Sequence, residues 1–171
     1  MGKELKTNAM RFLDTKKIAY EVQAYQCDEF IDGVHVAEKL GQPLDETFKT
    51  IVAQGKSGSY YCFLLPVAEE LDLKKAAKSV GEKSVELLHV KDITKVTGYV
   101  RGGCTPIGMK KQFMTVVHSS AQELEKFYIS GGRIGMQIHL SPTELVNAIN
   151  GKFEPIILSQ TWSCRYKNTV C

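Results

Sequence analysis

The sequence of 171 residues lacks long hydrophobic runs, paired cysteines and a strong net charge. No apolar stretch approaches the ~20 residues that a membrane-spanning helix needs, so an integral membrane protein is not expected. Residues 1–17 carry no apolar core of a secretory signal, which predicts a cytoplasmic location. A formal net charge of +3 is too small to indicate nucleic-acid binding by itself.

Neither the cysteines nor the histidines are spaced as metal ligands. The sequence has no C-x-x-C pair, and an odd number of widely separated cysteines does not fit a disulfide framework. We therefore expect reduced thiols, no bound metal and no cofactor. The residues concerned are Cys27, Cys62, Cys104, Cys164 and Cys171, together with His35, His89, His118 and His139.

Glycine, in contrast, is concentrated in the stretch Gly98–Lys111, which reads GYVRGGCTPIGMKK. Its four glycines and one proline fit no regular helix or strand, and glycine lets a ligand approach the main chain closely. We predict a backbone cradle for a small polar or anionic group. The stretch does not match the nucleotide-binding P-loop. Gly103 and Gly108 are separated by four residues as in that motif, but Met109 stands where the motif has its phosphate-binding lysine.

Apolar periodicity predicts short helices that interrupt a series of strands. This order indicates a single α+β domain with a largely antiparallel or mixed sheet over residues 1–158, and an irregular tail at 159–171. Helices are expected near 5–17, 35–40, 73–80 and 142–150, with a brief helical turn at Asp92 and a short helix capped by Ser120. Strands are expected at 19–25, 48–54, 60–66, 84–90, 113–118, 126–130, 136–140 and 153–158.

Three polar residues stand out on the predicted strands. By alternation Lys49 shares a face with two apolar residues of its strand, so it is either a partly buried site residue or an edge lysine whose head reaches solvent. Tyr25 points with the polar set of its strand, as a surface tyrosine or a site residue. Ser130 ends a strand before an expected turn at 131–135, where it could reach a cleft or simply bond to the turn.

Two further expectations concern side-chain direction and chemistry. The strand MQIHL alternates so that Met136, Ile138 and Leu140 point inward, whereas Gln137 and His139 point outward. Cys104 lies near a basic residue that could lower the pKa of its thiol, but no histidine or acid lies nearby in sequence, which disfavours a nucleophile. Residue spacing alone therefore predicts an α+β domain with a polar pocket, but it does not predict the class of ligand.

Three segments together resemble one known family. LPVAEELDLKKAAKSVG, TGYVRGGCTPIGMKK and FYISGGRIGMQIHL, in this order and spacing, closely resemble the YbaK family of aminoacyl-tRNA deacylases. That family is related to the editing domain inserted in bacterial prolyl-tRNA synthetases, and the resemblance runs from about Asn8 to Leu158. It implies a free-standing protein that clears Cys-tRNA(Pro), and in some members Cys-tRNA(Cys), beside prolyl-tRNA synthetase. The implied fold is a single α+β domain with a curled, mixed, barrel-like sheet flanked by short helices.

The resemblance also implies the site residues. Lys49, in Phe48-Lys49-Thr50, matches the family's key lysine and is the implied catalytic residue. The implied substrate-binding residues are Tyr25, Thr50, Gly102, Gly103, Pro106, Gly108 and Ser130. The chain departs from many relatives at Thr105, where they have serine, at Ile134, where they have a basic residue, and at His139, where an acidic residue is common. Cysteine is not required at the position of Cys104.

The resemblance is consistent with a mechanism in which the substrate's own thiol attacks its ester carbonyl and releases the tRNA. The enzyme then contributes positioning and electrostatic stabilisation. Backbone groups of Gly102 and Gly103 would hold the α-amine or the terminal ribose. Lys49 would bind the 3′-terminal phosphate or ribose, or stabilise developing charge, and Tyr25 and Ser130 would orient the aminoacyl group. Binding of tRNA should be weak and sensitive to salt.

Three alternatives stay open. The protein could remove another small residue, such as alanine from Ala-tRNA(Pro), by water attack. It could instead be a non-catalytic module that binds aminoacyl-tRNA or the synthetase. It could also bind a free amino acid or a nucleotide.

Overall fold

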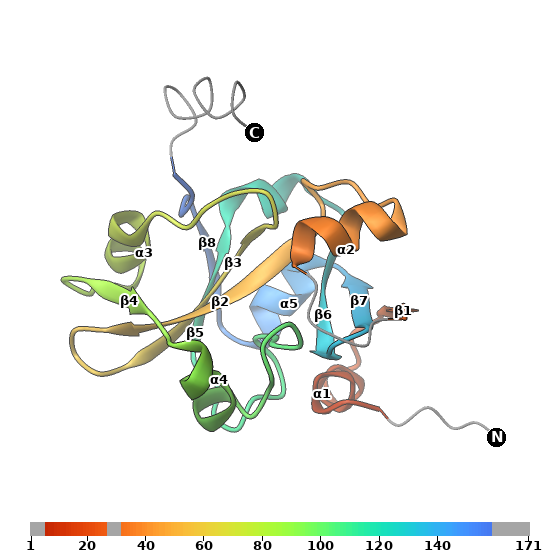
Figure 1. Ribbon diagram of the computed structural model, residues 1–171, viewed down its shortest axis with the longest axis horizontal. Coiled ribbons are helices and arrows are strands. Elements are labelled where there is room, and N and C mark those ends of the chain that lie inside the picture. Colours follow the sequence, from red (N-terminus) through yellow and green to blue (C-terminus); the bar gives the residue numbers. More distant parts are fainter. Residues whose placement is uncertain (1–5, 27–31, 159–171) are drawn as a thin grey trace.

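The computed structural model describes residues 6–26 and 32–158, which form one α+β unit with its helices around two sheets (Figure 1). The irregular tail predicted at 159–171 lies outside the described residues. The helices are α1 (Asn8–Thr15), α2 (Gly33–Leu40), α3 (Leu73–Val80), α4 (Val90–Thr97), α5 (Pro142–Ala148) and the 3₁₀ helix η1 (Ser119–Glu123). The strands are β1 (Glu21–Ala24), β2 (Phe48–Gly55), β3 (Tyr60–Pro66), β4 (Val85–Leu87), β5 (Met114–His118), β6 (Phe127–Arg133), β7 (Met136–Leu140) and β8 (Lys152–Glu154).

The strands form a small antiparallel sheet, β1-β7-β6, and a large mixed sheet, β4-β2-β3-β5-β8. In the large sheet β2 pairs antiparallel with β3 and β4, whereas β3–β5 and β5–β8 are parallel. A parallel bridge between Thr47 and Tyr128 links the two sheets. The predicted mixed α+β domain is confirmed. The barrel-like form is not, because the described strands make two sheets and no closed barrel.

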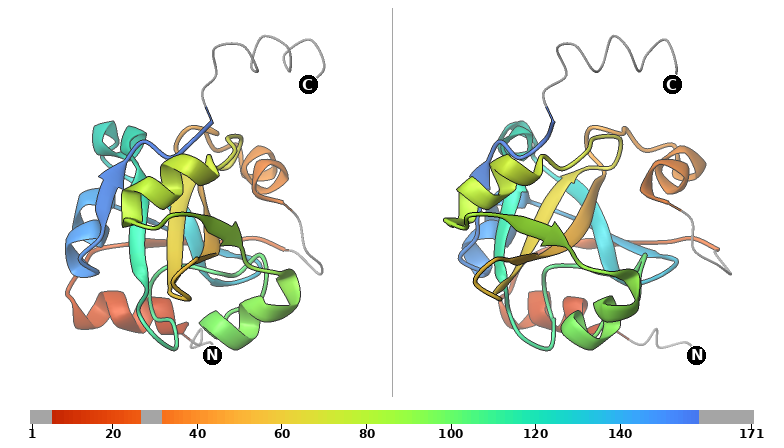
Figure 2. Two further views of the ribbon diagram at one scale, coloured as in Figure 1. Left: turned by 90° about the vertical axis from the view of Figure 1, so that its left-hand side faces the viewer. Right: turned by 60° about the vertical axis from the view of Figure 1, so that its left-hand side comes forward.

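Apolar side chains pack against both faces of the large sheet. Figure 2 shows α3 across one face of this sheet, where Ala76 and Ala77 pack against Phe63 and Val116. The opposite face packs against α1, α5 and the small sheet. Because both faces are covered, β3 reads as an almost continuous apolar run and is buried along nearly its whole length. None of the helices in the described part of the chain is long and apolar enough to span a membrane.

The helix ends follow the capping signals in the sequence. Asp72 accepts hydrogen bonds from two backbone N–H groups at the start of α3, and Ser141 accepts one at the start of α5. Gly41 and Gly81 end α2 and α3 in the left-handed conformation that glycine adopts without strain. These local signals predict both ends of α3.

Four sequence expectations need correction. The segment at Asp92 is not a brief turn but the eight-residue helix α4, with Asp92 in its first turn. The helix at Ser120 is a 3₁₀ helix without a side-chain cap. The segment 131–135 is not all turn, because β6 continues to Arg133 across a register shift that follows Ser130. Gln137 does not point outward into solvent but is buried, because Gln42 covers it and donates a hydrogen bond of 2.6 Å to its Oε1.

His118 ties the segment that follows β8 to the large sheet. Its buried Nδ1 accepts a hydrogen bond of 3.2 Å from the backbone N–H of Ile156, and burial lowers its pKa. The neutral ring is therefore the folded form. The unfolded chain takes up the proton first as the pH falls, so this stabilisation is complete above about pH 6.5 and is lost below it.

We expect His118→Phe to lower the free energy of unfolding by about 1–3 kcal/mol at pH 8, because it leaves a buried N–H unpaired. The difference from the wild type should shrink between pH 6.5 and pH 5. Urea unfolding at several pH values measures it, and a difference that is constant from pH 8 to pH 5 would contradict this role.

Candidate functional site

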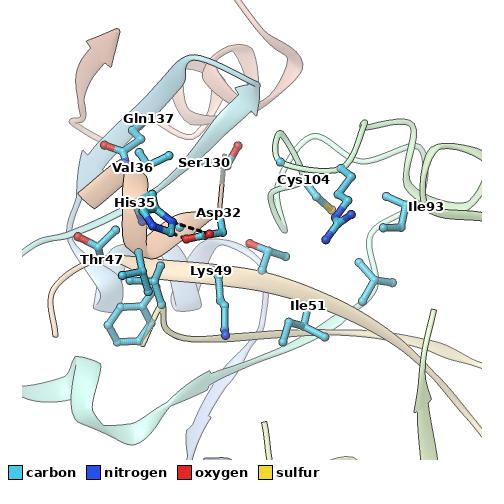
Figure 3. Close-up of a pocket in the computed structure, with 18 of the residues that line it drawn as sticks. Asp32, His35, Val36, Thr47, Lys49, Ile51, Ile93, Cys104, Ser130 and Gln137 are labelled. Atoms are coloured by element: carbon cyan, nitrogen blue, oxygen red, sulfur yellow. Dashed lines mark hydrogen bonds and ion pairs between the residues drawn. The ribbon is translucent and has the colours of Figure 1, made fainter. Parts of the chain in front are cut away.

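A cavity of about 710 Å³ opens where α2, the edge of β2, the β4–α4 segment and the glycine-rich loop meet the small sheet (Figure 3). Its polar lining includes Asp32, His35, Lys49, Arg101 and Gln137. Its apolar lining includes Val34, Val67, Leu87, Leu88, Ile93 and Met136. The cavity is large enough for an aminoacylated sugar, since ligand pockets commonly enclose about 300–1,000 Å³.

Lys49 is the half-buried cation of this site. Figure 3 shows its side chain on the same side of β2 as Ile51, whereas Asp32, Cys104 and Ser130 lie on the other side. Burial lowers its pKa, and the carboxylates of Glu70, Glu69 and Asp32 oppose that shift. Within the described ranges its ammonium group makes no hydrogen bond or ion pair. A partly desolvated cation in a cavity is suited to bind an anion.

Four more of the residues that the sequence singled out line the same cavity. Tyr25 directly follows β1, Ser130 lies in β6, Thr50 in β2, and Gly102 in the glycine-rich loop. The Ser130 hydroxyl accepts a hydrogen bond of 3.2 Å from the N–H of Gly132. The Thr50 hydroxyl is buried and has no hydrogen-bond partner in the part of the chain that the structure describes. The fold thus brings together residues from 25 to 130.

Three predicted site residues of the glycine-rich loop, Gly103, Pro106 and Gly108, are not among those that line the cavity. A Cβ on Gly103 would lie 2.7 Å from Cα of Arg133, and one on Gly108 would lie 2.6 Å from the backbone of Asn8. Pro106 is buried, and its carbonyl accepts a hydrogen bond of 2.9 Å from Gln112. These contacts indicate that Gly103, Pro106 and Gly108 shape the loop, while Gly102 faces the cavity. Direct substrate contacts of all four stay predictions.

Cys104 lines the cavity as a buried thiol. Burial raises its pKa to about 11, so the thiolate is scarce at neutral pH. The structure therefore supports the expectation that Cys104 is no nucleophile.

We predict that Cys104→Ala keeps the deacylation rate proposed below within about threefold of the wild type, because a nucleophile would cost far more. Single-turnover kinetics measure this. A loss of several orders of magnitude in a variant that folds would mean that the thiol reacts.

Sequence reasoning missed two polar features of the cavity. Asp32 caps α2 and lies 2.6 Å from Nδ1 of His35, which raises the pKa of His35 and lowers that of Asp32. An acid three residues before a histidine at a helix start could have signalled this pair. No sequence signal marks Gln137, because its burial depends on Gln42, which is distant in the chain. The described residues contain no cluster of three or more metal-ligating side chains.

Comparison with known proteins decides the family. The model of the aminoacyl-tRNA editing domain matches residues 32–148, which includes most of the cavity. The chain belongs to the aminoacyl-tRNA editing domain family. A relative from Enterococcus faecalis, named "Putative Cys-tRNA(Pro)/Cys-tRNA(Cys) deacylase EbsC", is 43% identical over 152 residues, covering 88% of this chain and 93% of the relative.

Solved structures share the fold of this editing domain. A crystal structure of the hypothetical protein APE2540 has a TM-score of 0.81 at 22% identity, covering 88% of this chain and 99% of that one. A structure described as "a putative trans-editing enzyme for prolyl tRNA synthetase" has a TM-score of 0.78 at 21% identity, covering 91% of this chain and 100% of that one. At these identities the likeness establishes the fold alone.

Proposed function

We propose that this editing domain is a deacylase that removes cysteine from mischarged Cys-tRNA(Pro) and also accepts Cys-tRNA(Cys). The observation that carries the proposal is the identity of 43%, over 93% of its length, with the relative named for these two substrates. The cavity supports it, since a half-buried cation and a loop backbone line a space that suits an aminoacylated ribose.

The chemistry can come from the substrate. The cysteine Sγ attacks its own ester carbonyl, the carbonyl carbon–ribose oxygen bond breaks, and the thiol proton ends on the ribose hydroxyl. The products are a cyclic thiolactone and free tRNA, and water later opens the thiolactone to cysteine. The protein need not supply a nucleophile, which fits the raised pKa of Cys104. Among the described residues Ser130 has no hydrogen bond to His35 that could activate its hydroxyl.

The protein's own residues then bind the substrate and stabilise the charge that develops during the reaction. Lys49 would hold the terminal phosphate or ribose, or offset negative charge that develops on the carbonyl oxygen. Tyr25 and Ser130 would orient the aminoacyl group, and the backbone of Gly102 would contact the ribose. Gly103, Pro106 and Gly108 would hold the loop in the shape that makes this contact.

A substrate panel tests the proposal. We expect release of cysteine from Cys-tRNA(Pro) and Cys-tRNA(Cys), and release at least about 100-fold slower from Ala-tRNA(Pro), which has no thiol to attack the ester. Tritiated amino acids measure the release, and trapping of the thiolactone identifies the route. Equal rates for cysteine and alanine would instead indicate water attack, and no release from any of them would indicate a binding module.

The partners are proposed with the activity. The domain would meet the 3′ end of aminoacylated tRNA in the cytoplasm and take its preference for tRNA(Pro) from prolyl-tRNA synthetase. The net charge of +3 predicts weak binding of tRNA alone, and this binding should weaken as salt is raised.

A further inference from the structure

The cavity runs along an open edge of the large sheet. Six consecutive residues, Thr47 through Val52, line it. Side chains of a strand alternate between two faces, so consecutive residues all reach one cavity only where that cavity meets the strand edge. On this side β2 pairs with β4 only from Ala53 onward, and the bridge of Thr47 to Tyr128 ends the other pairing. On this side of β2, opposite β3, no described strand pairs with the stretch between Thr47 and Ala53.

The hydrogen-bond pattern shows which backbone groups face the open edge. Gly55 donates its N–H to Ser59 on the β3 side, whereas the carbonyl of Val52 accepts from the N–H of Leu88 on the β4 side. In an antiparallel pair these directions alternate from residue to residue. The N–H and C=O of Thr50, two residues before Val52, therefore point into the cavity. Those of Ile51 point to β3.

Thr50 adds a third unpaired group at the same point. Its buried hydroxyl has no hydrogen-bond partner among the described residues. Proteins seldom leave buried donors and acceptors unpaired, and each exception calls for an explanation. One residue with an unpartnered hydroxyl and both backbone groups turned to a cavity indicates a ligand that supplies matching donors and acceptors.

We infer that Thr50 binds the aminoacyl group as if that group were a one-residue antiparallel strand added to β2. This inference rests on the proposed function. An aminoacyl ester carries an ammonium, a Cα and a carbonyl in the order of a peptide residue. The Thr50 carbonyl accepts from the α-ammonium, and the Thr50 N–H donates to the ester carbonyl, as directly opposed residues do in a hydrogen-bonded antiparallel pair.

This pairing fixes where the rest of the substrate lies. Opposed residues place their side chains on the same face of a sheet, so the substrate side chain lies on the face that carries the side chains of Thr50 and Val52. Val52 packs with Cys104 on this face. The substrate runs antiparallel to β2, so its ester oxygen and ribose leave toward the start of the strand, where Lys49 lies. The N–H of Thr50 also points at the oxygen that gains negative charge during thiol attack.

The experiment removes one N–H. Thr50→Val removes the hydroxyl and keeps the shape, and α-hydroxyvaline at position 50 then replaces only the N–H by an ester oxygen. We expect the ester variant to lose at least about 100-fold in kcat/KM for Cys-tRNA(Pro) relative to Thr50→Val, the size of effect seen when one oxyanion donor is removed. The matched control is lactic acid, the α-hydroxy analogue of alanine, at position 53, where the alanine N–H faces β3 and the residue does not line the cavity. It should lower the unfolding temperature more than the ester at position 50 does, and leave kcat/KM within about threefold.

A binding measurement separates this inference from the proposed function. A non-hydrolysable 3′-cysteinylamido adenosine should shift the amide proton of Thr50 downfield and leave that of Ile51 in place. Removing the α-amine from the ligand should weaken binding at least about tenfold. If the wild type binds this ligand but releases cysteine from no tRNA, the proposed function fails while the edge pairing stands. If the wild type is active but the ester at position 50 keeps the activity, or the Thr50 amide does not shift, the edge pairing is overturned.

Discussion

Replacing Lys49 by methionine lowers kcat/KM for Cys-tRNA(Pro) by at least about 100-fold, because the site loses a fixed, partly desolvated positive charge. Methionine keeps the length and apolar stem of lysine, so the half-buried side chain still fills its space. Burial already lowers the pKa of Lys49. Folding therefore works against the charge, and the variant should be as stable as the wild type or more stable. Single-turnover deacylation and thermal unfolding measure the two effects.

The matched control is Lys56→Met in the β2–β3 hairpin, where the side chain is exposed. It should leave both the rate and the stability nearly unchanged. Lys49→Arg asks whether charge alone is enough or whether a compact ammonium is needed. A Lys49→Met protein with a rate within about threefold of the wild type would remove Lys49 from the proposed mechanism.

Among the variants proposed here, Gly108→Ala should lower the free energy of unfolding most, by about 3 kcal/mol. Its φ of +67° costs a side chain about 1–2 kcal/mol, and overpacking adds about 1–3 kcal/mol more. The added Cβ would lie 2.6 Å from the backbone of Asn8, which cannot move aside as a flexible side chain does. Urea unfolding measures the loss.

Gly41→Ala isolates the contact term. Gly41 has nearly the same φ, +68°, but nothing lies within 4 Å of an added Cβ. It should lose only the conformational part, about 1–2 kcal/mol. Equal losses at Gly41 and Gly108 would show that the approach of the loop to α1 does not matter. A Gly108→Ala protein of normal stability with reduced binding would instead place Gly108 in the substrate site.

Much of the fold could be predicted because its signals are local. The strands β2 and β3, the hairpin between them and the capped helix α3 follow from alternation, from glycines in the turn and from Asp72 and Gly81. The division into two sheets could not be predicted in this way. It depends on which strand edges meet after folding, as in the bridge that joins Tyr128 of β6 to Thr47, the residue before β2.

For the candidate site, several of the lining residues could be predicted, but their arrangement in space could not. Alternation predicts only that Lys49 shares a strand face with apolar residues. The family resemblance implies the others, and the structure places Tyr25, Thr50, Gly102 and Ser130 around the same cavity as Lys49. Sequence could not tell that only part of the glycine-rich loop faces this cavity. That division depends on contacts between the loop and distant backbone, which no local pattern encodes.

The cavity sits on the seam between two independently paired sheets. Within the described ranges, a backbone bridge at Thr47 and a buried chain of side chains, in which Thr47 donates to Gln42 and Gln42 donates to Gln137, cross that seam beside the cavity. The apolar core that the two sheets share, in which Phe48 of β2 packs edge-on against Phe127 of β6, holds the sheets together, and these polar contacts lie between the sheets where the cavity opens. Substitutions in these polar contacts could retune the size of the accepted amino acid while leaving both hydrophobic cores intact.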